Sequence, residues 1–157
     1  MEVELVEITV ADVDIFDKTE YSVLSAEKRL ELIECSNLGV YSGKFFKFYL
    51  IKYGKTPVGV LNVCGVSADV VSVAPEIFLE FRGKGYAFLG LLAAYKKCVS
   101  IGFKTASAGI RADNTASRKL HEKLGFDLVK TYKSKSGKEM VYYLKPLKYN
   151  KKGNLYG

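Results

Sequence analysis

Apolar residues in this chain recur with two spacings, one typical of strands and one typical of helices. Alternation over residues 3–10 predicts a short strand, and residues 11–18 predict one or two helical turns. Ser25 suits the N-cap of a longer helix, whose apolar positions are Leu30, Leu32, Ile33 and Cys35. We therefore expect a strand followed by two or three helices in the first quarter of the chain.

The middle of the chain is rich in aromatic and β-branched residues. Residues 45–53 and 58–66 predict two strands of a hairpin, because turn-forming residues separate them. Residues 70–81 predict the next strand, interrupted at Ala74-Pro75. Proline cannot donate a hydrogen bond to a sheet, so we expect a bulge or a splayed strand there.

The C-terminal half changes period several times. Residues 86–101 predict a helix ended by Gly102, residues 105–111 a strand of small residues, and residues 113–124 a second helix. A final hairpin is expected over residues 126–144. The whole pattern predicts a mixed α+β sheet with helices on both faces.

The clearest candidate chemistry lies where an apolar strand gives way to the helix at residue 86. Gly83 and Gly85 leave the backbone free to turn and to be approached closely. The first turn of the helix has unpaired amides and a partial positive charge, and Arg82 and Lys84 add two full charges. This combination predicts an anion pocket, with phosphate as the expected anion.

Three phosphate motifs compete for this turn. A P-loop requires Gly-Lys-Ser/Thr, and Tyr86 follows Gly85 here, so this motif does not match. A dinucleotide-binding fingerprint needs a third glycine or alanine where Phe88 stands, so it matches poorly too. The run Arg82-x-x-Gly85-x-Ala87 instead resembles the Arg/Gln-x-x-Gly-x-Gly/Ala signature of the GNAT superfamily of N-acyltransferases. A tight surface turn with incidental cations is the structural alternative.

A second segment supports the resemblance. Residues 114–126 are similar to the family's signature Asn-x-x-Ala/Ser-x-x-Leu-Tyr-x-Lys-Leu-Gly-Phe, and they follow the first motif in the expected order. The resemblance covers residues 58–147. It implies one domain over residues 1–147, followed by a basic tail at 148–157. It also implies a GNAT-like central, mostly antiparallel sheet of six to seven strands with a splayed strand pair.

The family resemblance implies an N-acetyltransferase that uses acetyl-CoA as cosubstrate. The acetyl group would pass directly to a primary amine of a small molecule, an amino acid or a peptide, and the enzyme could be a homodimer. The splayed strand would pair with pantetheine, Asn114 would hydrogen-bond it, and Arg118 and Lys119 would help to offset phosphate charge. The implied cofactor-binding residues are Glu76, Ile77, Phe78, Arg82, Gly83, Lys84, Gly85, Tyr86, Ala87, Phe88, Asn114 and Ser117. Leu79 stands where the family usually has a proline before the loop.

His121 stands where the family most often has the tyrosine that protonates the departing thiolate. An imidazole can also donate a proton near neutral pH, so His121 is the candidate catalytic residue, with an exposed histidine of no catalytic task as the alternative. Other candidate acids are Tyr86, Tyr142 and Tyr143, and candidate bases acting through water are Glu76 and Glu80.

Composition and charge narrow the classes of protein to which this chain could belong. The net charge of +7 combines −7 over residues 1–40 with a basic remainder, which suits a protein that meets a cation and a polyanion in different parts. No apolar run is long enough to span a membrane, no secretory leader is visible, and a single histidine excludes a His-rich metal site. Three cysteines without metal-like spacing fit reduced thiols in a cytoplasm.

Two other functions stay open. A non-catalytic CoA-binding regulatory domain would bind the cofactor without turnover. A nucleic-acid-binding module would also be basic, but the acidic first quarter argues against a continuous surface that follows a phosphate backbone.

Overall fold

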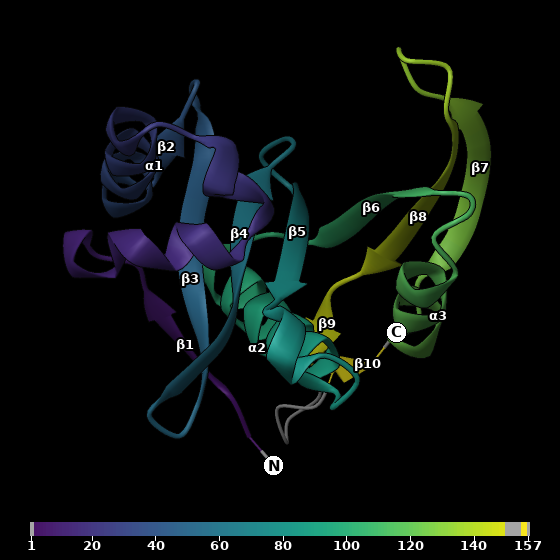
Figure 1. Ribbon diagram of the computed structural model, residues 1–157. Coiled ribbons are helices and arrows are strands. Elements are labelled where there is room, and N and C mark those ends of the chain that lie inside the picture. The colour runs from purple at the N-terminus through teal and green to yellow at the C-terminus, as the bar shows by residue number, and fades with distance from the viewer. Residues whose placement is uncertain (1, 150–154, 157) are drawn as a thin grey trace.

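The computed structural model describes residues 2–149 and 155–156 (Figure 1). Its α-helices are α1 (Ala26–Leu38), α2 (Tyr86–Ile101) and α3 (Thr115–Lys123), and its 3₁₀ helices are η1 (Val10–Lys18), η2 (Glu20–Val23) and η3 (Leu79–Phe81). Its strands are β1 (Glu4–Glu7), β2 (Val40–Tyr41), β3 (Lys44–Tyr53), β4 (Thr56–Gly65), β5 (Val70–Ile77), β6 (Thr105–Arg111), β7 (Asp127–Lys133), β8 (Glu139–Pro146), β9 (Lys148–Tyr149) and β10 (Leu155–Tyr156).

One mixed sheet organises the molecule. Its strands follow the order β1-β3-β4-β5-β6-β8-β7, and the two-residue β2 pairs with β3 beside this path. Every neighbouring pair is antiparallel except β5 and β6, which are parallel. The predicted mostly antiparallel α+β sheet is therefore confirmed.

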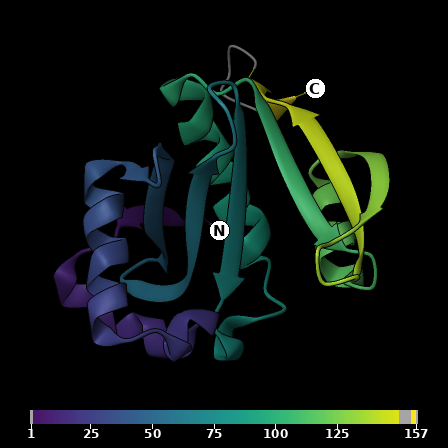
Figure 2. The same cartoon turned by 90° about the horizontal axis from the view of Figure 1, so that it is seen from above.

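Apolar side chains project from both faces of the sheet and form two hydrophobic cores. Leu91, Ala94 and Tyr95 of α2 pack into the larger core on one face. Phe16 of η1 and Ile33 of α1 pack into the second core on the other face, where Phe48 and Phe78 meet them. Helices consequently cover both faces of the N-terminal part of the sheet (Figure 2).

The sheet opens between its two parallel strands. β5 and β6 pair only from Val70 with Thr105 to Ser72 with Ser107, and beyond this point they diverge into a V (Figure 2). Pro75 lies in the open part of β5. The predicted splayed strand pair is confirmed.

The position of Pro75 follows from the alternation of backbone groups along a strand. The Phe78 amide donates to the Val58 carbonyl of β4 at 2.9 Å, whereas the Asp69 carbonyl accepts from Thr105 at the start of β6. Odd-numbered residues of β5 therefore direct their backbone groups toward the opening. Proline has no N–H to leave unpaired there, so its sheet position costs no hydrogen bond.

One detail of the predicted strand at 70–81 was wrong, and one of its two alternatives is now decided. The strand ends at Ile77, because Phe78 is buried in the second core and a short 3₁₀ helix follows. The β4–β5 register runs without a bulge from Gly65 with Val71 to Gly59 with Ile77. The proline is accommodated by divergence from β6 rather than by an inserted residue.

The basic tail predicted at 148–157 falls partly on residues 150–154 and 157, which lie outside the described residues. The short strands β9 and β10 within it pair with each other. Among the described residues, no helix combines the length and apolar character needed to cross a membrane.

Candidate functional site

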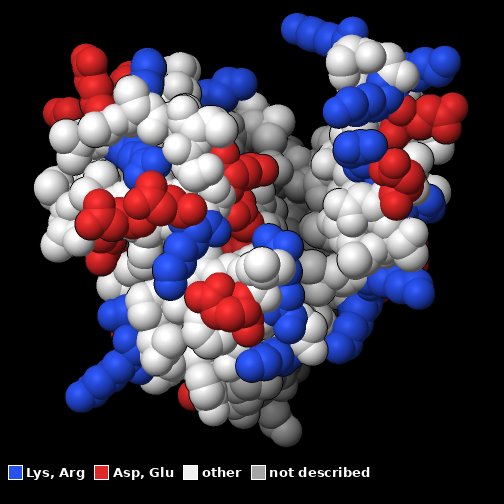
Figure 3. Space-filling view, in the orientation of Figure 1, with Lys and Arg blue, Asp and Glu red and all other residues white. Residues whose placement is uncertain are grey.

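A groove occupies the V between β5 and α3. Its volume is about 640 Å³, and it is formed by the end of β5, the turn before α2, the first turn of α2 and one side of α3. The space-filling view shows the molecule hollowed between the N-terminal body and the C-terminal arm (Figure 3). The groove therefore exists because β5 and β6 diverge instead of pairing along their whole length.

The turn that precedes α2 leaves several amides open. Gly83 and Gly85 have φ angles of 78° and 89°, in the left-handed region that favours glycine. The backbone bond from the Leu89 amide to the Gly85 carbonyl, at 3.2 Å, is the first of the helix. The amides of residues 86–88 precede it and have no intrahelical acceptor. Open amides at the N-terminus of a helix are suited to an anion, which agrees with the chemistry that the sequence predicts here.

Two cationic side chains line the groove near this turn. The Arg82 Nε donates to the Ile77 carbonyl at 2.9 Å, which holds the turn against the end of β5. The Lys123 Nζ of α3 lies 4.3 Å from the centroid of the Phe88 ring on α2. Lys84 does not line the groove; its Nζ lies over the Phe81 ring at 5.8 Å.

Arg118 and Lys119 also lie outside the groove lining. The Arg118 guanidinium donates to the Tyr143 hydroxyl at 3.1 Å and to the Ala112 carbonyl at 3.2 Å. The Tyr143 hydroxyl in turn donates to Glu122 at 2.9 Å. Arg118 thus joins α3 to β8, and its predicted contribution to phosphate charge finds no support in this geometry.

The open edge of β5 offers backbone groups to the groove. By the alternation described above, the Ile77 N–H points toward the opening, and Glu76 and Ile77 both line the groove. Phe78 does not, because its side chain is only 1 % exposed in the second core and its amide is bonded to Val58. The residues of β5 that line the groove are therefore Pro75 to Ile77, one position nearer the N-terminus than the predicted set.

The first turn of α3 forms the opposite wall. The Asn114 Oδ1 accepts from the Ser117 amide at 3.1 Å, so Asn114 caps the helix while lining the groove. Ser117 and His121 also line it, one and two turns farther along. Asn114 can therefore cap α3 and face the groove at the same time.

His121 is buried, with 4 % of its surface exposed. Its Nδ1 lies 2.8 Å from the Ser117 carbonyl, which can only accept, so Nδ1 carries the proton and Nε2 is the unprotonated nitrogen. Nε2 is buried without a hydrogen-bond partner among the described residues. Burial lowers the pKa of His121, and the Ser117 carbonyl opposes this shift. A neutral ring with an enclosed Nε2 is poorly suited to donate a proton at neutral pH.

The two candidate bases have different surroundings. Both carboxylate oxygens of Glu76 accept from the Glu20 amide, at 3.1 and 3.0 Å, and Glu76 lines the groove. Glu80 lies outside the lining and pairs with Lys18 at 3.4 Å. Of the candidate tyrosine acids, Tyr86 lines the groove, whereas Tyr142 and Tyr143 do not.

Comparison with known protein families shows to which family this chain belongs. The family model described as an acetyltransferase (GNAT) domain matches residues 9–127. The chain belongs to the GNAT acetyltransferases. GNAT domains use acetyl-CoA as the acetyl donor, and the open amides, the groove cations and the exposed strand edge fit a ligand with a diphosphate and an amide-containing arm.

Solved GNAT structures share the fold over nearly the whole chain. An acetyl transferase from Salmonella typhimurium, which modifies the N-terminal serine of 50S ribosomal subunit protein L7/L12, superimposes with a TM-score of 0.79 at 18% identity, covering 94% of this chain and 96% of that one. The microcin C7 self-immunity acetyltransferase MccE, in complex with acetyl-CoA and AMP, has a TM-score of 0.72 at 15% identity and covers 93% of both chains.

A spermidine N-acetyltransferase chimera from Vibrio cholerae and hSSAT has a TM-score of 0.76 at 14% identity, covering 92% of this chain and 94% of that one. No curated protein sequence matches the chain significantly. At these identities the structural neighbours establish the GNAT fold, and the substrate has to be argued from the residues of this chain.

His121 and all of the implied cofactor-binding residues except Phe78 and Lys84 line the groove, whereas the further candidates Glu80, Arg118, Lys119, Tyr142 and Tyr143 do not. The sequence reading missed further lining residues, which are Pro75, Phe81, Ala116, Leu120 and Lys123. Lys123 carried a usable signal, because it belongs to the second signature. Phe81 had none, since its position depends on where β5 ends.

Proposed function

We propose that this GNAT protein is an acetyl-CoA-dependent N-acetyltransferase whose acceptor is a primary amine. The amine nitrogen bonds to the acetyl carbonyl carbon, the carbon–sulfur bond breaks, and a proton from nitrogen ends on the thiol. The observation that carries the proposal is the groove itself, where open helix amides and a free strand edge meet in a member of this family.

Glu76 is proposed as the base. An amine attacks only after losing its extra proton, and a carboxylate beside the reacting centre can take that proton through one water. The backbone contact with Glu20 fixes Glu76 at the groove wall and leaves further lone pairs on its oxygens. Glu80 is less suitable, because its side chain lies outside the groove lining and is paired with Lys18.

His121 is proposed as a positioning residue rather than the acid predicted from the sequence. Its ring packs edge-on against Phe126 at 5.0 Å and is bonded to the Ser117 carbonyl, so it fixes the wall of α3 that faces the cofactor. The proton that reaches sulfur then comes from the attacking amine or from water.

Release of free thiol from acetyl-CoA in the presence of a panel of primary amines tests the proposal. We expect amine-dependent turnover in the wild type. In Glu76→Gln we expect kcat to fall by about 100-fold, the lower range for loss of a general base, with little change in the KM for acetyl-CoA. Glu80→Gln is the matched control and should retain wild-type kcat. Cofactor binding without turnover across the panel would instead indicate a regulatory domain.

A further inference from the structure

A second, smaller cavity lies on the other side of Glu76. Its volume is about 110 Å³, and Pro75 and Glu76 line both this cavity and the groove. Phe48 and Val60 close its base, each with 1 % of its surface exposed. Because the proposed base lines both spaces, a molecule seated in the cavity lies next to that base.

The cavity is built for a positively charged guest. Glu20 and Glu76 supply two carboxylates, and its described lining contains no lysine or arginine. The rings of Tyr21 and Phe48 meet edge-on with their centroids 5.6 Å apart and supply aromatic surface, which favours cations. A free carboxylate on the guest would meet like charge on two sides.

Tyr21 and Asn62, which are hydrogen-bonded to each other at the cavity wall, also provide a hydrogen-bond donor. The Tyr21 hydroxyl accepts from the Asn62 amide at 2.7 Å, so its own hydrogen stays available. Burial, assisted by the nearby charge of Glu20, raises the pKa of Tyr21 to about 12. The hydroxyl therefore keeps its proton and adds no third negative charge.

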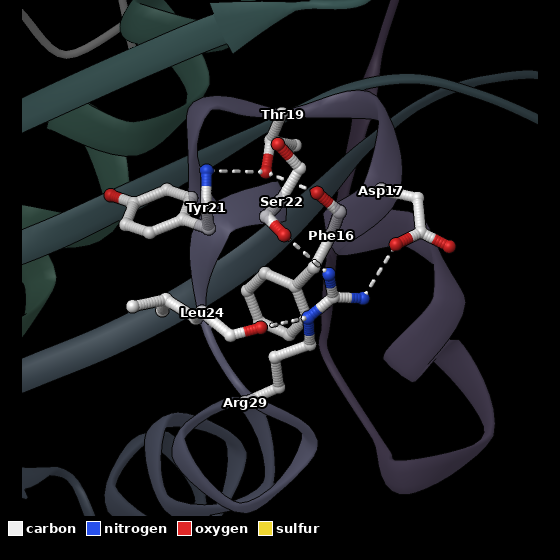
Figure 4. A network of polar contacts seen from close by, with 7 residues as sticks. All are labelled: Phe16, Asp17, Thr19, Tyr21, Ser22, Leu24 and Arg29. Atoms are coloured by element: carbon white, nitrogen blue, oxygen red, sulfur yellow. Dashed lines mark hydrogen bonds and ion pairs between the residues drawn. The ribbon is translucent and has the colours of Figure 1, made fainter.

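The segment that carries Glu20 and Tyr21 is held rigidly from behind. The Arg29 guanidinium donates to Asp17 at 2.8 Å, to the Ser22 carbonyl at 2.9 Å and to the Leu24 carbonyl at 3.2 Å. Figure 4 shows the Tyr21 ring pointing away from this network. The network fixes η2, so the cavity wall is formed before any ligand arrives.

We infer that this cavity selects acceptors that carry a second cationic group, of which a short aliphatic diamine is the simplest. One amine reacts as described above, with its proton transferred to the departing sulfur. The other stays protonated beside Glu20 and the Tyr21 and Phe48 rings. The inference rests on the proposed acetyltransferase function and adds the substrate class and the residues that determine it.

Four amines with the same four-carbon chain test the inference, namely 1,4-diaminobutane, butylamine, 4-aminobutanol and 4-aminobutanoate. We expect kcat/KM for the diamine to exceed that for butylamine by about tenfold, the combined size of a partly exposed ion pair and a cation–π contact. The aminobutanoate should be the poorest substrate. Added salt should reduce the advantage of the diamine.

Glu20→Gln removes the charge but keeps the backbone amide that holds Glu76. In this variant kcat/KM for the diamine should fall close to that for butylamine. Glu27→Gln, an exposed change on α1 outside the cavity lining, is the matched control and should preserve the preference. Similar kcat/KM values for all four amines, or a preference that survives Glu20→Gln, would overturn the inference and leave the acetyltransferase intact. No turnover with any amine would overturn both.

Discussion

At the scale of single residues, the site depends on which side chains of α3 face the groove. Lys119 and Lys123 are one helical turn apart, yet only Lys123 lines the groove, where its Nζ lies over the Phe88 ring. A cation held there by an aromatic ring is close to the open amides of α2 and can add to their attraction for phosphate.

Lys123→Glu should therefore weaken coenzyme A binding by about tenfold, since one favourable charge contact becomes unfavourable. Lys119→Glu has the same change of net charge on the same helix and should weaken binding by no more than about twofold. Dissociation constants from fluorescence or calorimetric titration at one fixed salt concentration would check the pair. Equal losses in the two variants would mean that only the overall charge matters.

His121 gives a pH prediction with a defined sign. Its pKa is lowered in the folded protein, so the unfolded chain binds more protons between the folded value and about 6.5. The stabilising contribution is complete above pH 6.5 and is lost as the pH falls through the folded pKa. Urea midpoints between pH 7.5 and pH 5 should decline more steeply for wild type than for His121→Gln; parallel curves would contradict this account.

The sequence identified His121 and Asn114 as site residues but could not give their surroundings. The cap at Asn114 follows from local helix rules. The burial of His121 depends on Phe126, beyond the end of α3, and on the neighbouring sheet, so the neutral state of the ring could not be read from its unperturbed pKa. Residue type was predictable, and protonation state was not.

At the scale of elements, the end of β5 packs closely against β4. Gly59 of β4 lies opposite Ile77, and a Cβ at Gly59 would lie 2.5 Å from the Glu76 carbonyl oxygen and 3.0 Å from the Ile77 Cα. Both atoms belong to the backbone, so a side chain at this position would displace β5 rather than a flexible group. Glycine here sets the position of the proposed base.

Gly59→Ala should destabilise the protein by about 1–3 kcal/mol, the usual cost of overpacking, and should reduce kcat by more than the loss of folded protein explains. Denaturant unfolding and turnover per folded molecule would separate the two effects. Wild-type turnover in a destabilised Gly59→Ala protein would show that the position of β5 is not critical for catalysis.

Element boundaries were predictable where local signals govern them. Ser25 caps α1, and Gly102 follows the last residue of α2, as the sequence indicates. The end of β5 was not predictable, because Phe78 is apolar enough to continue a strand and leaves it only to fill the second core. Proline at 75 predicted an irregularity, but divergence from β6 rather than a bulge is a property of the whole sheet.

At the scale of the whole molecule, two halves with different charge meet at Glu76. The N-terminal segment contributes Glu20 and Tyr21 to the small cavity, and the turn before α2 and α3 contribute the groove cations Arg82 and Lys123. Acidic side chains gather over the N-terminal helices in Figure 3, whereas lysines and arginines dominate the C-terminal arm. The charge asymmetry visible in the sequence thus corresponds to a small cavity lined by carboxylates and a groove lined by cations.

Titration calorimetry with coenzyme A tests the central claim most directly, because every further step requires the cofactor to lie against the amides that precede Leu89. We predict saturable one-to-one binding that is weakened in Gly85→Ala, whose backbone cannot easily adopt a φ of 89°. No measurable heat at millimolar ligand, or equal affinity in the wild type and this variant, would contradict the account.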